Sequence, residues 1–165
     1  MGRHITRPAA SRNRRVSENL SDEDVNALQA LIASSNLNSI EYYEMTARRY
    51  DTPLSEEDAS DQGQLTIGVQ QRRDEDSFGV RLNARIVVSV GEAEVSVAGE
   101  YALTDPATLT ARALQLFASE VAVMTVFPYL REAMASLTGR VFHQPLHLPM
   151  ISRGELAVDL IDPEA

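Results

Sequence analysis

The chain has 165 residues, of which 44% are hydrophobic, so it has the length and composition of one globular domain with a sizeable core. It contains no cysteine, which excludes disulfides, thiol nucleophiles and sites where cysteine holds zinc or an iron–sulfur cluster. The formal net charge is −9, yet residues 1–15 carry five arginines and no acid, so the remainder stands at −14 by subtraction. Such an acidic body should repel the phosphate backbone of nucleic acids.

Residues 1–20 are predicted to be a disordered basic arm, because they combine few apolar side chains with like charges. A basic arm could touch nucleic acid or anionic lipid, but a solvated tail is the favoured interpretation. No apolar stretch follows the arginines, so the arm lacks the pattern of a secretory signal. We expect residues 21–160 to form one domain and residues 161–165 a tail.

The first regular elements are a helix and a strand. Ser21-Asp22-Glu23-Asp24 is a capping box that predicts a helix over residues 22–33. Residues 37–50 then predict a strand rich in tyrosine and β-formers. Its alternation is imperfect, since one face would carry Ile40 and Tyr42 and the other Tyr43, Met45 and Ala47. Either a bulge shifts the register or both faces are partly covered.

An acidic stretch over residues 51–62 is predicted to be a loop, too long for a tight hairpin. The strands on either side of it are therefore not expected to be neighbours in the sheet. Leu65, Ile67 and Val69 alternate with polar residues or glycine in the second strand. After a charged turn, the cleanest alternation in the chain runs over residues 78–90 and is followed by another over 95–103. Together they predict two strands joined as a hairpin, with the turn at Gly91-Glu92.

Asp105-Pro106 predicts the start of a long helix, with the carboxylate as cap. Ser119 and Glu120 belong to its predicted polar face. From Val121 to Leu130 the helix is apolar nearly all round, so it must be covered on every side. Ten residues are too few to cross a bilayer, which needs roughly 20, so the expected cover is protein and partly another subunit.

Two features should shape the end of that helix. Pro128 predicts a kink or a restart, because proline removes a backbone donor and clashes with the preceding turn. Gly139 is expected to close the helix in the left-handed conformation. Residues 142–150 should be extended, and residues 151–160 could form a short strand or a frayed helix.

No catalytic constellation is visible. His143 and His147 could hold a metal only if that segment were helical, and proline between them argues against it. Phosphate-binding glycine motifs and nucleophile elbows are missing as well. Glu92, Glu94 and Glu100 could be a dock for a basic partner, although a solvated strand face is slightly favoured. We therefore expect no enzyme, no metal and no cofactor.

The segment Phe127 to Arg140, FPYLREAMASLTGR, followed by Pro145-Leu146-His147-Leu148, resembles the long helix and following extended segment of SecB-family export chaperones. The similarity is greatest to the SecB-like actinobacterial branch, some members of which serve toxin–antitoxin pairs. The resemblance implies an α+β fold with a four-stranded antiparallel sheet, a crossover loop and a long helix. It also implies a dimer of dimers with helices between the sheets, that is, a homotetramer.

The resemblance further implies a cytoplasmic, ATP-independent chaperone that holds unfolded polypeptides in apolar grooves. Its clients would be preproteins for export, with SecA as a possible partner, or a dedicated antitoxin. Nucleic acid and stable membrane insertion are not expected. The family's second helix is replaced here by residues 151–160, and the loop at 51–62 lacks the usual aromatic residues, which leaves SecA and the client range open.

Two sets of residues are predicted for these roles. The client-binding set is Tyr42, Tyr43, Leu65, Ile67, Val69, Leu146, Leu148 and Met150. The oligomer-interface set is Val121, Val123, Met124 and Phe127. The alternative function is an oligomeric α+β domain that binds a small apolar ligand, which would require a closed cavity.

Overall fold

A computed structural model describes residues 20–61 and 65–151. The predicted arm up to residue 19, the element expected from residue 152 onward and the tail at 161–165 lie outside the described residues. The described elements are, in chain order, α1 (Asp22–Ser34), β1 (Ser35–Arg49), α2 (Glu56–Asp61), β2 (Leu65–Arg73), β3 (Ser77–Val88), β4 (Gly91–Leu103), η2 (Pro106–Thr108), α3 (Ala111–Phe117), η3 (Ala118–Ala122) and α4 (Val123–Val141).

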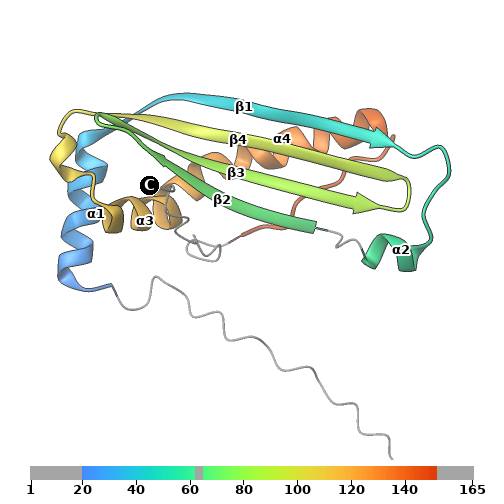
Figure 1. Cartoon of the computed structure of the whole chain (residues 1–165), viewed down its shortest axis with the longest axis horizontal. Helices are drawn as coiled ribbons and strands as arrows, with labels where there is room; N and C mark the ends of the chain where they lie inside the picture. The colour runs from blue at the N-terminus through green and yellow to red at the C-terminus, as the bar shows by residue number, and fades with distance from the viewer. Residues whose placement is uncertain (1–19, 62–64, 152–165) are drawn as a thin grey trace, which may run out of the picture.

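The four strands form one antiparallel sheet in the order β1-β4-β3-β2 (Figure 1). The predicted crossover is confirmed, since β1 and β2 follow each other in the chain but lie at opposite edges. The hairpin of β3 and β4 is confirmed too, with its turn at Ser89 and Val90 rather than at Gly91. The α+β fold class with a sheet followed by a long helix is therefore correct.

Strand β1 contains the bulge that its imperfect alternation allowed. Its pairing with β4 shifts register between Leu37 and Ser39 and again between Tyr42 and Glu44. Tyr42 pairs with Val97 and Met45 with Val95, so both lie on the inner face of the sheet, toward the helices. The assignment of Met45 and Ala47 to the face opposite Tyr42 was wrong, because the extra residue in the strand restores them to one face.

The acidic crossover is not entirely a loop, which corrects the prediction for residues 51–62. It contains α2, whose first amide groups are capped by Ser55. The Asp58 N–H donates to the Ser55 hydroxyl oxygen at 3.1 Å, and that hydroxyl donates to the Asp58 carboxylate at 2.8 Å. Ala59 is buried, and α2 contacts β3, so the crossover is anchored on the sheet.

The long helix begins later than predicted and in three parts. Asp105 caps only the 3₁₀ turn η2, whereas Thr110 caps α3 by accepting from the Ala113 N–H. The π turn η3 then separates α3 from α4, with the Val123 N–H bonded to the Ala118 carbonyl. No restart occurs at Pro128, because α4 has already begun at Val123 and runs through Pro128.

The end of α4 also differs from the prediction. Gly139 lies within α4, which continues to Val141 and is closed by the Phe142 N–H bonded to the Thr138 carbonyl at 2.7 Å. His143 takes the left-handed conformation instead, with φ of 60°. A non-glycine residue in this position is uncommon, and it turns the chain back along the helix.

The core lies between the inner face of the sheet and the helices that follow it. One cluster joins β2, β3 and β4 to α4 and to Phe142 and Leu148, and the other joins β3 and β4 to α1 and α3. In the second cluster the rings of Phe78, Tyr101 and Phe117 lie 4.9 to 5.0 Å apart. Ser119 and Glu120, predicted on a polar face, are buried instead.

Helix α1 is fastened to α3 by a bidentate ion pair. The Arg112 Nε and Nη2 atoms donate to the two Asp24 oxygens at 3.0 and 2.8 Å. These hydrogen bonds, opposed by partial burial, hold the pKa of Asp24 below its ordinary value of 3.8. The pair is partly exposed to solvent, so it specifies the docking of α1 more than it adds to stability.

This pair should make the folded chain more sensitive to acid. The pKa of Asp24 is lower in the folded chain than in the unfolded one. Its contribution to the free energy of unfolding is therefore present above the unfolded pKa and is lost as the pH falls through the folded pKa. Replacement of Asp24 by asparagine should therefore reduce the drop in melting temperature between neutral pH and about pH 2. Glu23→Gln, one residue away and exposed, is the control. An equal drop in Asp24→Asn and wild type would contradict this role.

Candidate functional site

The inner face of the sheet is covered unevenly. Helix α4 runs behind β4 and β1, and the chain then returns from the end of α4 toward β2 (Figure 1). This return segment, residues 143–151, has no regular secondary structure. It is held by the Arg131 Nε, which donates to the Leu148 carbonyl at 3.1 Å, and by the Leu146 N–H, which donates to the Thr138 hydroxyl at 2.8 Å.

Three of the predicted client-binding residues pack against the core between the sheet and α4. Ile67, Val69 and Leu146 are half-buried and pack against the same core cluster. Leu65 and Met150 remain exposed next to them in the chain, with 39% and 82% of their surface accessible. Leu148 is fully buried and serves as the anchor of the return segment. We call Leu65, Ile67, Val69, Leu146 and Met150 the β2-side surface.

Tyr42 lies at the opposite edge of the sheet. It is 45% exposed on the inner face of β1, and Leu37 and Met45 on the same face are exposed to a similar degree. Partial burial raises the pKa of the Tyr42 hydroxyl above its ordinary value, and the charge of Glu132 and the nearby Tyr129 raise it further. Tyr42 therefore lies close to α4. We call Leu37, Tyr42 and Met45 the β1-edge surface.

Tyr43 belongs to neither of these surfaces. It is the extra residue at the bulge and lies on the outer face of the sheet, where the Arg81 guanidinium stands 3.6 Å from its ring centroid. Its hydroxyl donates to Glu100 at 3.1 Å. The structure thus divides the predicted client-binding set among two apolar surfaces and one residue on the far face.

The predicted interface residues alternate between core and surface. Val123 and Phe127 are buried in the core of the chain itself, Val121 is half-buried, and Met124 is 41% exposed. Met124, Pro128, Tyr129 and Glu132 are all exposed along one side of α4. Met124, Pro128 and Glu132 follow one another at spacings of four residues, and Tyr129 lies three residues before Glu132, so they share this side. We call these four residues the α4 stripe. Its first three members are largely apolar.

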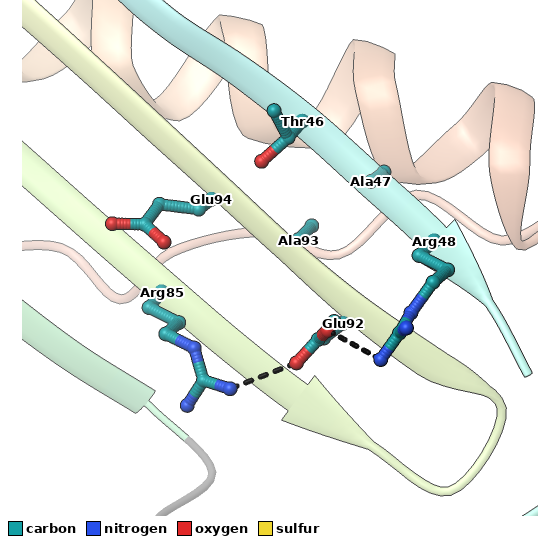
Figure 2. A pocket seen from close by; sticks show the side chains of 7 residues that line it. All are labelled: Thr46, Ala47, Arg48, Arg85, Glu92, Ala93 and Glu94. Atoms are coloured by element: carbon teal, nitrogen blue, oxygen red, sulfur yellow. Dashed lines mark hydrogen bonds and ion pairs between the residues drawn. The ribbon is translucent and has the colours of Figure 1, made fainter.

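The outer face of the sheet is polar and internally paired. Figure 2 shows Glu92 between two arginines of neighbouring strands, accepting from Arg48 at 2.9 Å and from Arg85 at 2.8 Å. These residues, with Glu94, line a hollow of about 340 Å³. Glu100 likewise accepts from Arg72. Two of the three carboxylates considered as a dock for a basic partner are therefore already neutralised.

Sequence reasoning missed Leu37, Met45 and Tyr129 as exposed apolar residues. The two bulges of β1 concealed Leu37 and Met45, since an unbroken alternation assigns them to the wrong face. Tyr129 was treated as part of a helix covered on all sides. Its spacing of three residues from Glu132 was the available signal for a surface stripe.

Neither a metal site nor a clear membrane span emerges from the described residues. No group of three or more histidine, aspartate or glutamate side chains among them could hold a metal ion. One helical stretch, Ala111–Val141, is long and apolar enough to cross a membrane by length and composition alone. However, 67% of its most apolar window is buried inside the fold, as in the core helix of a soluble protein.

No protein-family model matches the sequence, and no curated protein matches it significantly. Among solved structures, the chain is similar to the SecB-like chaperone Rv1957 of Mycobacterium tuberculosis, in complex with a ChAD peptide from the Rv1956 HigA1 antitoxin. The identity is 24% and the TM-score 0.60, over 78% of this chain and 98% of that one. The predicted resemblance is thus confirmed, and the chain has a SecB-like fold.

A protein of unknown function from Streptococcus agalactiae is also similar, at 8% identity and a TM-score of 0.41. The match covers 70% of this chain and 97% of that one. This similarity is too low to add to the assignment of the fold.

Proposed function

We propose that this protein is a cytoplasmic, ATP-independent chaperone that holds unfolded polypeptides on apolar surface at the edges of its sheet. The observation that carries the proposal is the β2-side surface, where Leu65 and Met150 are exposed and the other apolar members are half-buried on a SecB-like fold. A binding surface of this kind needs no catalytic group, in keeping with a chaperone rather than an enzyme.

The physical case rests on the kind of contact that such a surface can make. A holding chaperone must accept many sequences, so it should use apolar area rather than a fixed hydrogen-bond pattern. At about 25 cal/mol per Å², each large side chain covered contributes roughly 1 to 2 kcal/mol before entropic costs. Several such contacts add up along an extended chain, whereas a folded protein keeps its apolar groups inside.

An antitoxin is the client class that we favour. The similar chaperone of Mycobacterium tuberculosis is in complex with a peptide from an antitoxin. Export of preproteins, with SecA as partner, is supported here by the resemblance of residues 127–148 alone. We therefore place a dedicated client before general export.

We further propose that the subunits assemble through the α4 stripe. A helix that exposes Met124, Pro128 and Tyr129 along one side leaves apolar area in water, which a second subunit would cover. Val121 lies half-buried beside this stripe, while Val123 and Phe127 support it from the core. A dimer of dimers is the arrangement that the resemblance favours.

A pair of neighbouring substitutions tests the client-binding surface. Leu65→Asp places a charge on the exposed apolar side of β2, and Thr66→Asp places the same charge one residue away on the outer face. We expect Leu65→Asp to weaken the suppression of aggregation of an unfolded reporter, measured by light scattering, by about tenfold, and Thr66→Asp to leave it unchanged.

Both variants should fold, because both positions are exposed. Circular dichroism and sedimentation serve to check the fold and the assembly. If wild type does not suppress aggregation at all, the chaperone proposal is wrong. If the two variants lose activity equally, the β2-side surface is not the binding site.

A further inference from the structure

Methionine supplies all the sulfur in this chain, which has five methionines and no cysteine. Four of them lie in the described residues. Met134 is fully buried, whereas Met45, Met124 and Met150 expose 47%, 41% and 82% of their surface. Because oxidation of a thioether follows its exposure, the described methionines divide into one protected and three accessible side chains.

The accessible methionines coincide with the apolar surfaces. Met45 belongs to the β1-edge surface, beside Tyr42 on the inner face. Met150 belongs to the β2-side surface, at the end of the return segment. Met124 lies in the α4 stripe, which the proposed assembly would cover. Methionine is common on surfaces that bind many partners, since its flexible thioether adapts to different side chains.

We propose that Met45 and Met150 are sites of reversible oxidation that turn the client-holding surfaces off, an inference that rests on the proposed chaperone function. The oxidant is of the peroxide class. The sulfur lone pair attacks one peroxide oxygen, an S–O bond forms and the O–O bond breaks, so that the sulfur loses two electrons and the peroxide gains them. After proton transfer, water leaves, and a thiol-dependent sulfoxide reductase restores the thioether.

The consequence follows from polarity. A sulfoxide carries a strong hydrogen-bond acceptor where the thioether was apolar, so covering it with an apolar client leaves that acceptor without a partner. Each oxidised methionine that a client covers should lower affinity by about tenfold. The core should be unaffected, because Met134 is inaccessible.

The experiment treats the full chain with hydrogen peroxide, removes the oxidant and maps the added oxygen by peptide mass spectrometry. Client holding is measured by light scattering before oxidation, after it, and after treatment with methionine sulfoxide reductase. The double variant Met45→Leu/Met150→Leu keeps apolar side chains that cannot be oxidised. Met134→Leu is the matched control, since this swap conserves volume and leaves both proposed sites in place.

We expect oxygen on Met45 and Met150 but not on Met134, loss of holding in wild type and in Met134→Leu, and retention in the double variant. Reductase should restore holding. The proposal is overturned if oxidised wild type holds the client as well as before, or if the double variant loses holding to the same extent. If untreated wild type holds no client, the chaperone function itself fails, and this proposal fails with it.

Discussion

Replacing Val123 with aspartate is expected to unfold the subunit. Val123 is 1% exposed and packs in the core cluster with Phe127 and Leu130. An unpaired carboxylate there would be buried among apolar side chains, which costs several kcal/mol. A domain of this size is stable by about 5 to 15 kcal/mol, so most of that stability would be lost. Circular dichroism and denaturant unfolding would show it.

The neighbouring position separates folding from assembly. Met124 is 41% exposed on the α4 stripe, so Met124→Asp should leave the melting temperature within a few degrees of wild type. The same charge would be buried between subunits and should reduce the mass found by sedimentation. A monomeric wild type would refute the assembly. A Met124→Asp protein that keeps the wild-type mass would place the contact elsewhere.

Gly91→Ala should be the other strongly destabilising substitution. A Cβ atom at Gly91 would lie 2.2 Å from the backbone carbonyl oxygen of Arg48 and 2.6 Å from the ring of Phe142. The carbonyl belongs to the β1–β4 ladder and cannot move alone, so strand pairing or the packing of Phe142 must give way. Such overpacking costs about 1 to 3 kcal/mol or more. Denaturant unfolding measures the loss.

Gly139→Ala is the matched control and should act in the opposite direction. Gly139 lies inside α4, and the nearest atom to an added Cβ is a Pro145 carbon at 3.7 Å, an ordinary contact. Alanine in a helix interior is favoured over glycine by about 0.5 to 1 kcal/mol. A destabilised Gly139→Ala would mean that this position does close the helix.

The sheet could be predicted well for strands that bury one face and expose the other to solvent. Residues 78–90 and 95–103 alternate with few interruptions, of which Val87 is one, so their strands and hairpin followed directly. The crossover followed from the length of the acidic stretch. Residues of β1 could be assigned to a strand but not to faces, because a bulge is decided by pairing with β4 and leaves only a broken alternation in the chain.

A local signal was present at one of the two helix errors, the missed helix α2. Ser55-Glu56-Glu57-Asp58 has the same capping-box spacing as Ser21 to Asp24, and it begins α2 as the earlier one begins α1. At the end of α4, glycine was the expected left-handed residue, yet His143 takes that conformation. The packing of Phe142 and Leu148 against the core determines where the helix stops, and no local pattern records it.

The candidate site was predicted in part. Alternation identified Leu65, Ile67 and Val69 as apolar, and Ile67 and Val69 pack against the same core cluster as Leu146. Exposure could not be predicted from the same pattern. Leu148 and Met150 share a face by spacing, yet Leu148 is fully buried and Met150 is mostly exposed. Tertiary packing of Leu148 in the core cluster with α4 makes that difference.

The two bulges of β1 allow this strand to lose a single residue at either bulge without a change of register elsewhere. Leu37 and Ser39 pair with the consecutive residues Tyr101 and Glu100, and Tyr42 and Glu44 pair with Val97 and Ser96. Loss of the codon for Asn38 or Tyr43 would therefore join two stretches whose partners are already adjacent. Loss of a codon elsewhere in β1 would turn the following side chains to the other face. The strand can shorten at these two positions during evolution while its apolar edge stays where it is.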